Sequence, residues 1–406
     1  MDLDRLGITD VPASWRQYAP VADRFDKPDW LLPAHAVRVF GLPLDVLAPL
    51  EEVLAAIRRD GDLTALADLW HYLICHLPGD TGDNPSLWPL PIASLGELAP
   101  LFPLAVVVSA TDDALEAFQR AGASTDVALT TLSYSGYFVR DYRKKCGAWG
   151  LSELGWLRNF VRGELFQLGR LSFRPVVYDW PFRAFRNRRD GSVVTLCEPS
   201  TRFQADGLAG GTNGVFDAEA WSPTLEIGRD VIAGHPASDD GRALAESVAL
   251  DARDWEQILA SGEHVIEVHI PAENGKLTPE ACADSYRRAV DFFTGRCPRG
   301  EYAAFTCWSW LLDPGLAQML PPESNIVRFQ RAFHPVPVAG DESQAYDLVF
   351  GDSAADPVTI SKTTALQRAI ADYAASGSKL RSGAGYMLWD EVAARLRAAA
   401  TRSRGG

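Results

Sequence analysis

The sequence predicts an α+β protein with a mainly helical N-terminal part and a C-terminal part built on a mixed β-sheet. Up to about residue 165, apolar residues recur at helical spacing, as at positions 46, 47, 50, 53, 54 and 57. Beyond that point short strand-like runs appear, and strands then alternate with helices. A chain of 406 residues is long enough for two domains. We therefore expect domains at 1–165 and 166–406.

The N-terminal part is predicted to be a series of helices. They are expected at 41–61, 62–77, 111–122, 125–147 and 151–163, and three of them stop at a glycine (Gly61, Gly122 and Gly163). The apolar run 101–110 fits either a buried strand or the start of a helix, because a short continuous apolar run has no diagnostic period.

The C-terminal part starts with strand-like segments and continues with a β-α-β unit. The first segments are 168–180, 181–189 and 191–199, with a turn at 189–191. A strand at 264–271, a helix at 277–293 capped by Thr278, and a strand at 301–312 follow. We expect the two strands to be parallel neighbours joined by a right-handed crossover. Further along we expect a short helix at 313–321, strands at 325–336 and 345–351, and helices near 363–376 and 387–400 that are joined by a Gly/Ser turn.

Composition and charge exclude several classes of protein. The net charge of −14 disfavours binding to nucleic acid or to anionic membranes. The acidic N-terminus has no apolar run, and no stretch reaches the 18–20 apolar residues or so of a membrane span. The six cysteines form no CxxC pair and HExxH is absent, so we expect reduced thiols, no metal site and a cytoplasmic location.

A basic segment stands out in this acidic chain. Twelve Lys and Arg lie between Arg140 and Arg189, against four Asp and Glu. Such a segment can attract an anionic ligand, such as a nucleotide phosphate tail or the acidic face of a carrier protein. The interleaved Phe182 and Phe185 would also suit single-stranded nucleic acid. Alternatively, these cations pair with carboxylates elsewhere in the fold.

Four strings point to a family when they are taken together. LFQLGRLSF, VHIP followed by LTPEAC, SWLLDP and SNIVRFQ resemble a two-part bacterial acyltransferase family. Its members have an N-acyltransferase N-terminal domain followed by a GNAT-like C-terminal domain, and the resemblance covers about residues 40–385. It implies a GNAT-like fold, an acyl-CoA or acyl-carrier thioester as donor, and a small-molecule amine or hydroxyl as acceptor.

The strand HVIEVHIP holds the first candidate catalytic residues. Glu267 and His269 lie two residues apart and therefore share one face, opposite an apolar face. Either could remove the proton that an ammonium acceptor must lose before it attacks a thioester. The alternative is an edge strand with one solvated face. On the next strand, Ser309 could donate its hydroxyl proton to the thiolate leaving group.

The loop 271–279 is the candidate binding site for the donor. It offers Gly275, Lys276 and the backbone amides that precede the helix, which suit a phosphate. Arg170 is a further candidate, either for the donor or for a structural ion pair between the domains. The R/Q-x-x-G-x-G/A loop of GNAT proteins is absent here, which leaves open a carrier-protein donor or a catalytically silent binding protein. His76 and Asp80 match an HxxxD spacing, but the Pro and Gly between them are typical of a turn.

Overall fold

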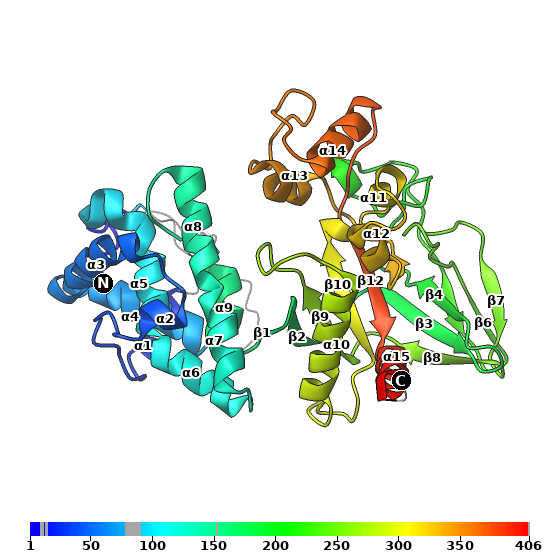
Figure 1. Ribbon diagram of the computed structural model, residues 1–406, viewed down its shortest axis with the longest axis horizontal. Coiled ribbons are helices and arrows are strands. Elements are labelled where there is room, and N and C mark those ends of the chain that lie inside the picture. The colour runs from blue at the N-terminus through cyan, green and yellow to red at the C-terminus, as the bar shows by residue number, and fades with distance from the viewer. Residues whose placement is uncertain (9–11, 13–14, 78–90, 152, 405–406) are drawn as a thin grey trace. The chain divides into compact units, whose positions relative to one another are not determined.

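The computed structural model describes the chain apart from residues 9–11, 13–14, 78–90, 152 and 405–406. The chain forms two compact units, Met1–Gln167 and Leu168–Gly406 (Figure 1). The first is helical and the second contains the sheets, so the α+β prediction is confirmed.

The first unit is a bundle of short helices. They are α1 (Trp15–Ala22), α2 (Ala36–Val39), α3 (Leu47–Arg59), α4 (Gly61–Cys75), α5 (Phe102–Ser109), α6 (Thr111–Arg120), α7 (Thr125–Ser133), α8 (Ser135–Cys146) and α9 (Leu154–Val161), with 3-10 turns η1 (Leu44–Val46) and η3 (Ala93–Leu101). The ambiguous run 101–110 is mostly helix α5, whose residues from Phe102 to Val108 are all buried. Burial on every side explains why this run shows no helical period.

Helix α4 lies at the centre of this bundle. The carboxylate of Asp60 caps its N-terminus by accepting from the amides of Asp62 and Leu63. Trp70 packs edge-on against Trp15 and Phe102, with ring centroids 6.2 and 5.2 Å apart. Among the described residues no single helix is long and apolar enough to cross a membrane. One bent pair, Ala93–Ser109 with Thr111–Arg120, passes that test by length and composition only.

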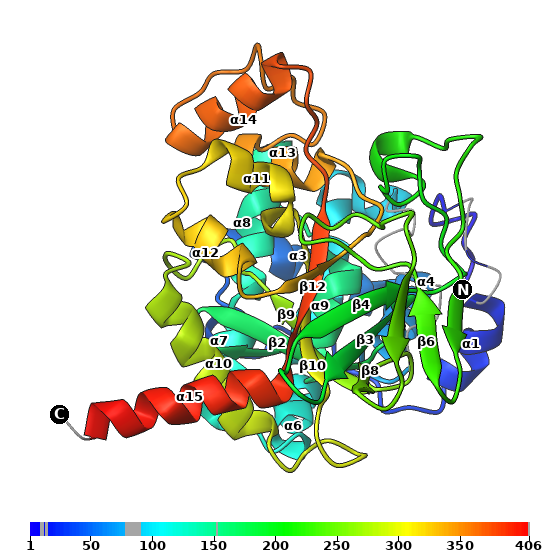
Figure 2. The ribbon, with the colours of Figure 1, turned by 90° about the vertical axis from the view of Figure 1, so that its right-hand side faces the viewer.

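The second unit is built on a six-stranded mixed sheet with the order β1-β2-β9-β10-β12-β11 (Figures 1 and 2). Its strands are β1 (Phe166–Leu168), β2 (Leu171–Val177), β9 (His264–His269), β10 (Ala304–Ser309), β12 (Gly383–Leu388) and β11 (His334–Val336). Strands β9 and β10 are parallel neighbours, and helix α10 (Pro279–Phe293) connects them, as the sequence predicts. The hydroxyl of Thr278 caps α10 by accepting from the amide of Ala281.

Two layers cover this sheet. One face packs on α10 and on α15 (Trp389–Arg404), where the ring of Tyr286 lies 5.9 and 5.3 Å from those of Phe173 and Phe305. The other face shares a core with the sheet β4-β3-β8. The smaller strands are β3 (Phe182–Asn187), β4 (Val193–Cys197) and β8 (Trp255–Leu259), and a third sheet holds β5 (Leu225–Ile227), β6 (Val231–Gly234) and β7 (Val248–Asp251).

The remaining elements are the 3-10 turns η4 (Thr212–Gly214) and η5 (Trp310–Leu312) and the helices α11 (Pro314–Met319), α12 (Asn325–Gln330), α13 (Ser343–Phe350) and α14 (Ala365–Ala375). Of these, α11, α13 and α14 lie at the end of β10 that is farther from α15 (Figure 2). The predicted helices at 313–321 and 363–376 are confirmed as α11 and α14.

Three predictions for the C-terminal region are wrong. The first half of the expected strand 325–336 is helix α12, because the hydroxyl of Ser324 caps its N-terminus, and only His334–Val336 form a strand, β11. The expected strand 345–351 lies in helix α13, which ends at the left-handed Gly351. The segment before the last helix was expected to be a turn, but it is strand β12, buried along its whole length.

Candidate functional site

Strands β9 and β10 separate at their C-terminal ends. They pair side by side only from Val265 with Ala304 to Glu267 with Thr306. Beyond this point β9 stays paired with β2 up to His269, and β10 stays paired with β12 up to Ser309. A wedge therefore opens between the two central parallel strands. Such a gap at the carboxyl ends of parallel strands is a place where a ligand can reach the backbone of a sheet.

Glu267 and His269 lie at the edge of this wedge, on the same face of β9. The Nε2 atom of His269 is 3.4 Å from Oε2 of Glu267, and both side chains are about a quarter to a third exposed. The Nε of Arg174, on the neighbouring strand β2, donates to the same Oε2 at 2.9 Å. Burial raises the pKa of the Glu267 carboxyl, but the contact with His269 and the charge of Arg174 outweigh it and leave that pKa below its usual value.

The strand register adds two more side chains to this face. Thr306 lies directly opposite Glu267 and is buried. Two residues further along β10 is Trp308, which is 53% exposed although most large apolar side chains of this sheet are buried. Residues opposite each other in a sheet share a face, so a carboxylate, an imidazole, a hydroxyl and an exposed indole line one side of the wedge.

The third predicted catalytic residue, Ser309, lies at the end of β10. By strand alternation it belongs to the other face, with Cys307. Its hydroxyl accepts a hydrogen bond from the amide of Leu311 at 3.2 Å and so caps the turn η5, which leaves the hydroxyl proton available. Burial and, to a smaller extent, the charge of Glu267 raise the pKa of the Cys307 thiol. That thiol therefore stays protonated and is a poor nucleophile.

The loop before α10 brings two of the predicted donor-binding residues together. The Nε of Arg170 donates to the carbonyl of Gly275 at 2.9 Å. The hydroxyl of Ser285 on α10 accepts from the amides of Arg170 and Leu171 at 2.8 and 3.2 Å. Arg170 thus holds the loop within one unit, while Lys276, one residue after Gly275, is exposed.

An apolar cavity of about 230 Å³ lies on the helical side of the sheet. Its wall is formed by α10, α12, α15 and Met387 of β12. Leu277 and Pro279 line it at the start of α10, and Ala332 lines it just after α12. Tyr286 of α10 also forms part of its wall.

Much of the basic segment is used in internal ion pairs. Four arginines of the β3–β4 hairpin contact carboxylates at 2.6–2.7 Å: Arg183 with Glu198, Arg186 with Asp390, Arg188 with Glu256 and Arg189 with Asp254. These contacts favour the structural alternative for this part of the segment.

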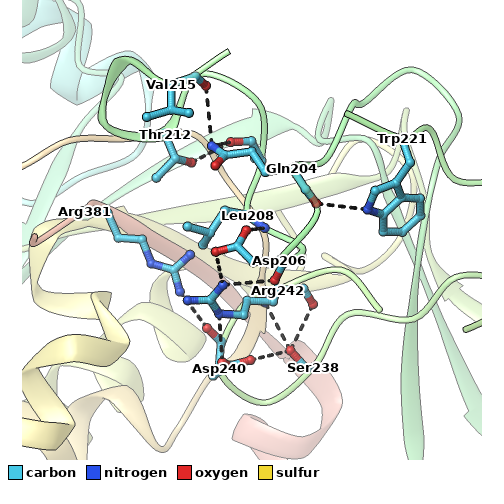
Figure 3. Close-up of polar contacts among 11 residues, drawn as sticks. Gln204, Asp206, Leu208, Thr212, Val215, Trp221, Ser238, Asp240, Arg242 and Arg381 are labelled. Carbon is cyan, nitrogen blue, oxygen red and sulfur yellow. Dashed lines mark hydrogen bonds and ion pairs between the residues drawn. The ribbon is translucent and has the colours of Figure 1, made fainter. Parts of the chain in front are cut away.

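The glycine-rich segment 209–214 is held by a separate polar network (Figure 3). The side chain of Arg242 contacts the carboxylates of Asp206 and Asp240 at 2.7 and 3.2 Å. The Nη2 of Arg381 donates to the carbonyl of Asp240 at 2.9 Å. Thr212 donates to the carbonyl of Ala209 at 2.7 Å within the segment. The side chain of Gln204 donates to the carbonyl of Ala209 at 3.4 Å, and the amide of Asn213 donates to the carbonyl of Gly340 at 2.9 Å. These contacts tie the segment to its own neighbours, which fits a structural role.

Sequence reasoning missed Arg174, Thr306 and Trp308. Alternation along β10 already placed Thr306 and Trp308 on one face, but only the register shows that this is the face of Glu267. The HxxxD motif at His76 falls partly outside the described residues, because Asp80 is not among them.

Both parts of the chain match the models of known protein domain families. The model of an N-acyltransferase N-terminal domain matches residues 34–163, and that of a GNAT-like C-terminal domain matches residues 165–387. The resemblance inferred from the sequence is thereby confirmed. No match was found among curated protein sequences.

Solved structures share the fold over almost the whole chain. An acyltransferase in complex with decanoyl-CoA has a TM-score of 0.64 at 19% identity, covering 95% of this chain and 99% of that chain. An acyltransferase mutant, orf11*, in complex with octanoyl-CoA has a TM-score of 0.62 at 20% identity, covering 95% and 98%. An acyltransferase bound to decanoyl-CoA and teicoplanin has a TM-score of 0.60 at 21% identity, covering 95% and 98%.

Proposed function

This chain belongs to the acyltransferases with an N-acyltransferase N-terminal domain and a GNAT-like C-terminal domain, and we propose that it transfers an acyl group from acyl-CoA to a small-molecule amine. The observation that carries the proposal is the carboxylate–imidazole pair, Glu267 and His269, at the edge of the wedge between β9 and β10. A hydroxyl acceptor is the alternative that the family leaves open.

The reaction proceeds by direct attack, without an acyl-enzyme. The ammonium group of the acceptor loses a proton, directly or through a water molecule, to the ring nitrogen of His269 that does not face Glu267, while Glu267 orients the imidazole through Nε2. The neutral amine then attacks the thioester carbonyl, and backbone amides near the end of β9 polarise that carbonyl. When the tetrahedral intermediate collapses, the C–S bond breaks and the CoA thiolate takes a proton from the hydroxyl of Ser309. Through a water molecule, that hydroxyl regains a proton from the attacking nitrogen, which becomes the amide nitrogen of the product.

The loop before α10 is the proposed site for the phosphates of the donor. Asn274 and Gly275 both have left-handed backbone conformations, with φ of 83° and 85°. That geometry turns the chain into the N-terminus of a 15-residue helix. The amides and dipole of such a terminus favour an anion, and Lys276 adds a charge beside it. Arg170 supports the site by fixing the carbonyl of Gly275.

The apolar cavity under α10 is the proposed site for the acyl chain. Its lining is mostly carbon, and Tyr286 of α10 forms part of its wall. The related solved structures hold octanoyl-CoA or decanoyl-CoA, so we propose a medium-chain acyl-CoA donor. Because each buried methylene contributes about 0.8 kcal/mol, a chain inside the cavity should bind several-fold more tightly for each added carbon.

The test combines donor binding with release of CoA. Calorimetry is run with CoA, acetyl-CoA and octanoyl-CoA, and thiol release is followed with octanoyl-CoA and teicoplanin as the first acceptor. We expect binding of octanoyl-CoA and amine-dependent thiol release. His269→Ala should lower turnover by about 10²–10⁴-fold while leaving donor binding unchanged.

Three outcomes would point elsewhere. A His269→Ala protein with wild-type turnover would show that this histidine is structural. Octanoyl-CoA binding without thiol release for any amine or hydroxyl acceptor would support a silent binding protein. If no CoA species binds at low salt, while an acyl-carrier protein loaded with the same acyl group does, the donor is carrier-bound.

A further inference from the structure

The helical N-terminal unit brings three metal-ligand side chains to one point. His71 and Cys75 are one turn apart on α4 and therefore share a face of that helix. Asp113 comes from the first turn of α6, which packs in the same bundle. One ligand atom from each of the three residues lies within 4.8 Å of the other two.

The spacing of these atoms fits a metal better than a hydrogen bond. The Nε2 of His71 is 3.4 Å from Oδ2 of Asp113. A charge-assisted hydrogen bond between such groups is about 2.7–2.9 Å long. Two ligands at about 2.1 Å from a tetrahedral zinc ion are about 3.4 Å apart. In such a site the sulfur lies about 3.6 Å from each of the other two ligand atoms. Because the three ligand atoms here lie within 4.8 Å of one another, a side-chain rotation that moves the sulfur by about 1 Å completes the site.

The state of His71 is a second, independent observation. Its side chain is only 4% exposed, and its Nε2 has no hydrogen-bond partner among the described residues. A buried polar atom without a partner is destabilising, and natural proteins seldom leave one. Its distance of 3.4 Å to Oδ2 of Asp113 is the separation that two ligands of one tetrahedral ion have, with the ion to one side of the line that joins them.

We propose that His71, Cys75 and Asp113 bind one zinc ion, and that the fourth coordination position opens into the adjacent cavity. A thiolate, a carboxylate and a neutral imidazole balance the charge of Zn²⁺, which makes the site neutral overall. Three protein ligands and an open position are the arrangement of zinc sites that exchange a ligand, whereas purely structural sites have four protein ligands.

The adjacent cavity gives access to the fourth coordination position of the zinc, and the charges of its wall favour an anion there. It has a volume of about 220 Å³, and Cys75 and Asp113 form part of its wall. Arg120 and Arg162 also line it, and the latter donates to the carbonyls of Leu73 and Ile74 at the end of α4. His76 and Glu164 line the cavity as well. Because the two guanidinium groups outnumber this one carboxylate beside a neutral zinc site, the zinc should hold a water molecule that a small anion can replace.

Cobalt titration of the chelator-treated full chain tests the proposal. We expect one equivalent of Co²⁺ to give a thiolate-to-metal charge-transfer band and strong tetrahedral ligand-field bands, both displaced by Zn²⁺. Cys75→Ser should lose the charge-transfer band, and Asp113→Asn should bind at least about tenfold more weakly. Cys146→Ser is the matched control, because this exposed cysteine on α8 lies in the same unit, and it should behave as the wild type.

A measurement on the wild type guards against misfolded variants. Zinc should slow alkylation of Cys75 at least tenfold, as read by peptide mass spectrometry, and should leave Cys146 unaffected. The proposal is overturned if the wild type binds no Co²⁺, if Cys75→Ser keeps the charge-transfer band, or if zinc leaves alkylation of Cys75 unchanged. Thiocyanate should shift the ligand-field bands, and an unchanged spectrum would contradict the open fourth position.

Discussion

Asp313 should make the C-terminal unit less stable as the pH rises from about 4 to about 6. This carboxyl follows the turn at the end of β10 and is 2% exposed. It accepts from the amide of Gly315 at 2.8 Å and from that of Arg381 at 2.6 Å, so it ties the end of β10 to the segment before β12. Burial outweighs these two hydrogen bonds and raises its pKa to about 6.

The magnitude follows from the difference between the folded and unfolded pKa. A carboxyl at about 6 in the folded protein and at about 4 in the unfolded chain differs by about two units, or about 3 kcal/mol. Between these values the folded state binds more protons than the unfolded state, so the free energy of unfolding falls as pH rises. Below pH 4 or so and above pH 6 or so the contribution of Asp313 should be constant.

Urea unfolding between pH 4 and 7 compares the wild type with Asp313→Asn. The variant loses one acceptor, which lowers its stability at every pH, but it cannot titrate at this position. The stability difference between the two proteins should therefore change by about 3 kcal/mol across the window. Asp372→Asn, at an exposed position of α14, is the control and should show no such change. A difference that stays constant with pH would refute the reasoning.

Three further variants and one control variant test the site and its support. Arg174→Met removes the counter-charge of the carboxylate–imidazole pair, so the pH–rate profile should move and turnover should fall at least tenfold, and an unchanged profile would contradict this role. Gly169→Ala combines a left-handed φ of 81° with a Cβ 2.8 Å from the hydroxyl of Ser285, and it should lower stability by about 2 kcal/mol or more. Gly191→Ala has a similar φ of 74° in open space and should be destabilised less, so equal losses would count against the contact. Ala332→Trp should fill part of the apolar cavity and remove the preference for octanoyl-CoA over acetyl-CoA in calorimetry, and a retained preference would place the chain elsewhere.

The β9-α10-β10 unit could be predicted because its signals are local. Thr278 and Pro279 mark the start of the helix, and the alternation of β9 fixes which side chains share a face. Segments 325–330 and 345–350 could not be assigned in the same way. Over six residues an apolar pattern fits a strand and a helix alike, and the outcome depends on a cap at Ser324 and on the stop at Gly351.

The glycines of β12 show how tertiary contacts reverse a local signal. Gly383 and Gly385 look like turn residues in the sequence. In the structure a Cβ on Gly383 would lie 2.1 Å from the carbonyl of Leu312, and one on Gly385 would lie 2.8 Å from that of His334. These glycines are therefore required because another backbone passes close to a buried strand. No pattern within the segment itself carries that information.

The residues of the candidate site also form two groups: those that local spacing in the sequence predicts, and those that only the fold brings together. Glu267 and His269 could be found because they are two residues apart on one strand. Arg174 is 93 residues away from Glu267, and only the pairing of β2 with β9 brings it there. The cluster of His71, Cys75 and Asp113 escaped a search for short zinc motifs because its third member lies on a different helix.

The arginines of the β3–β4 hairpin bear on how the donor is held. The sequence alone suggests that these four arginines form a surface that attracts phosphate. In the fold, however, each of them contacts a carboxylate. A paired guanidinium contributes little long-range field, because the partner charge cancels it within a few ångströms. In the proposed binding site, the phosphates of the donor would depend on the amides at the N-terminus of α10 and on Lys276. Because backbone dipoles release no counterions, donor binding should depend on salt much less than the basic segment alone would suggest.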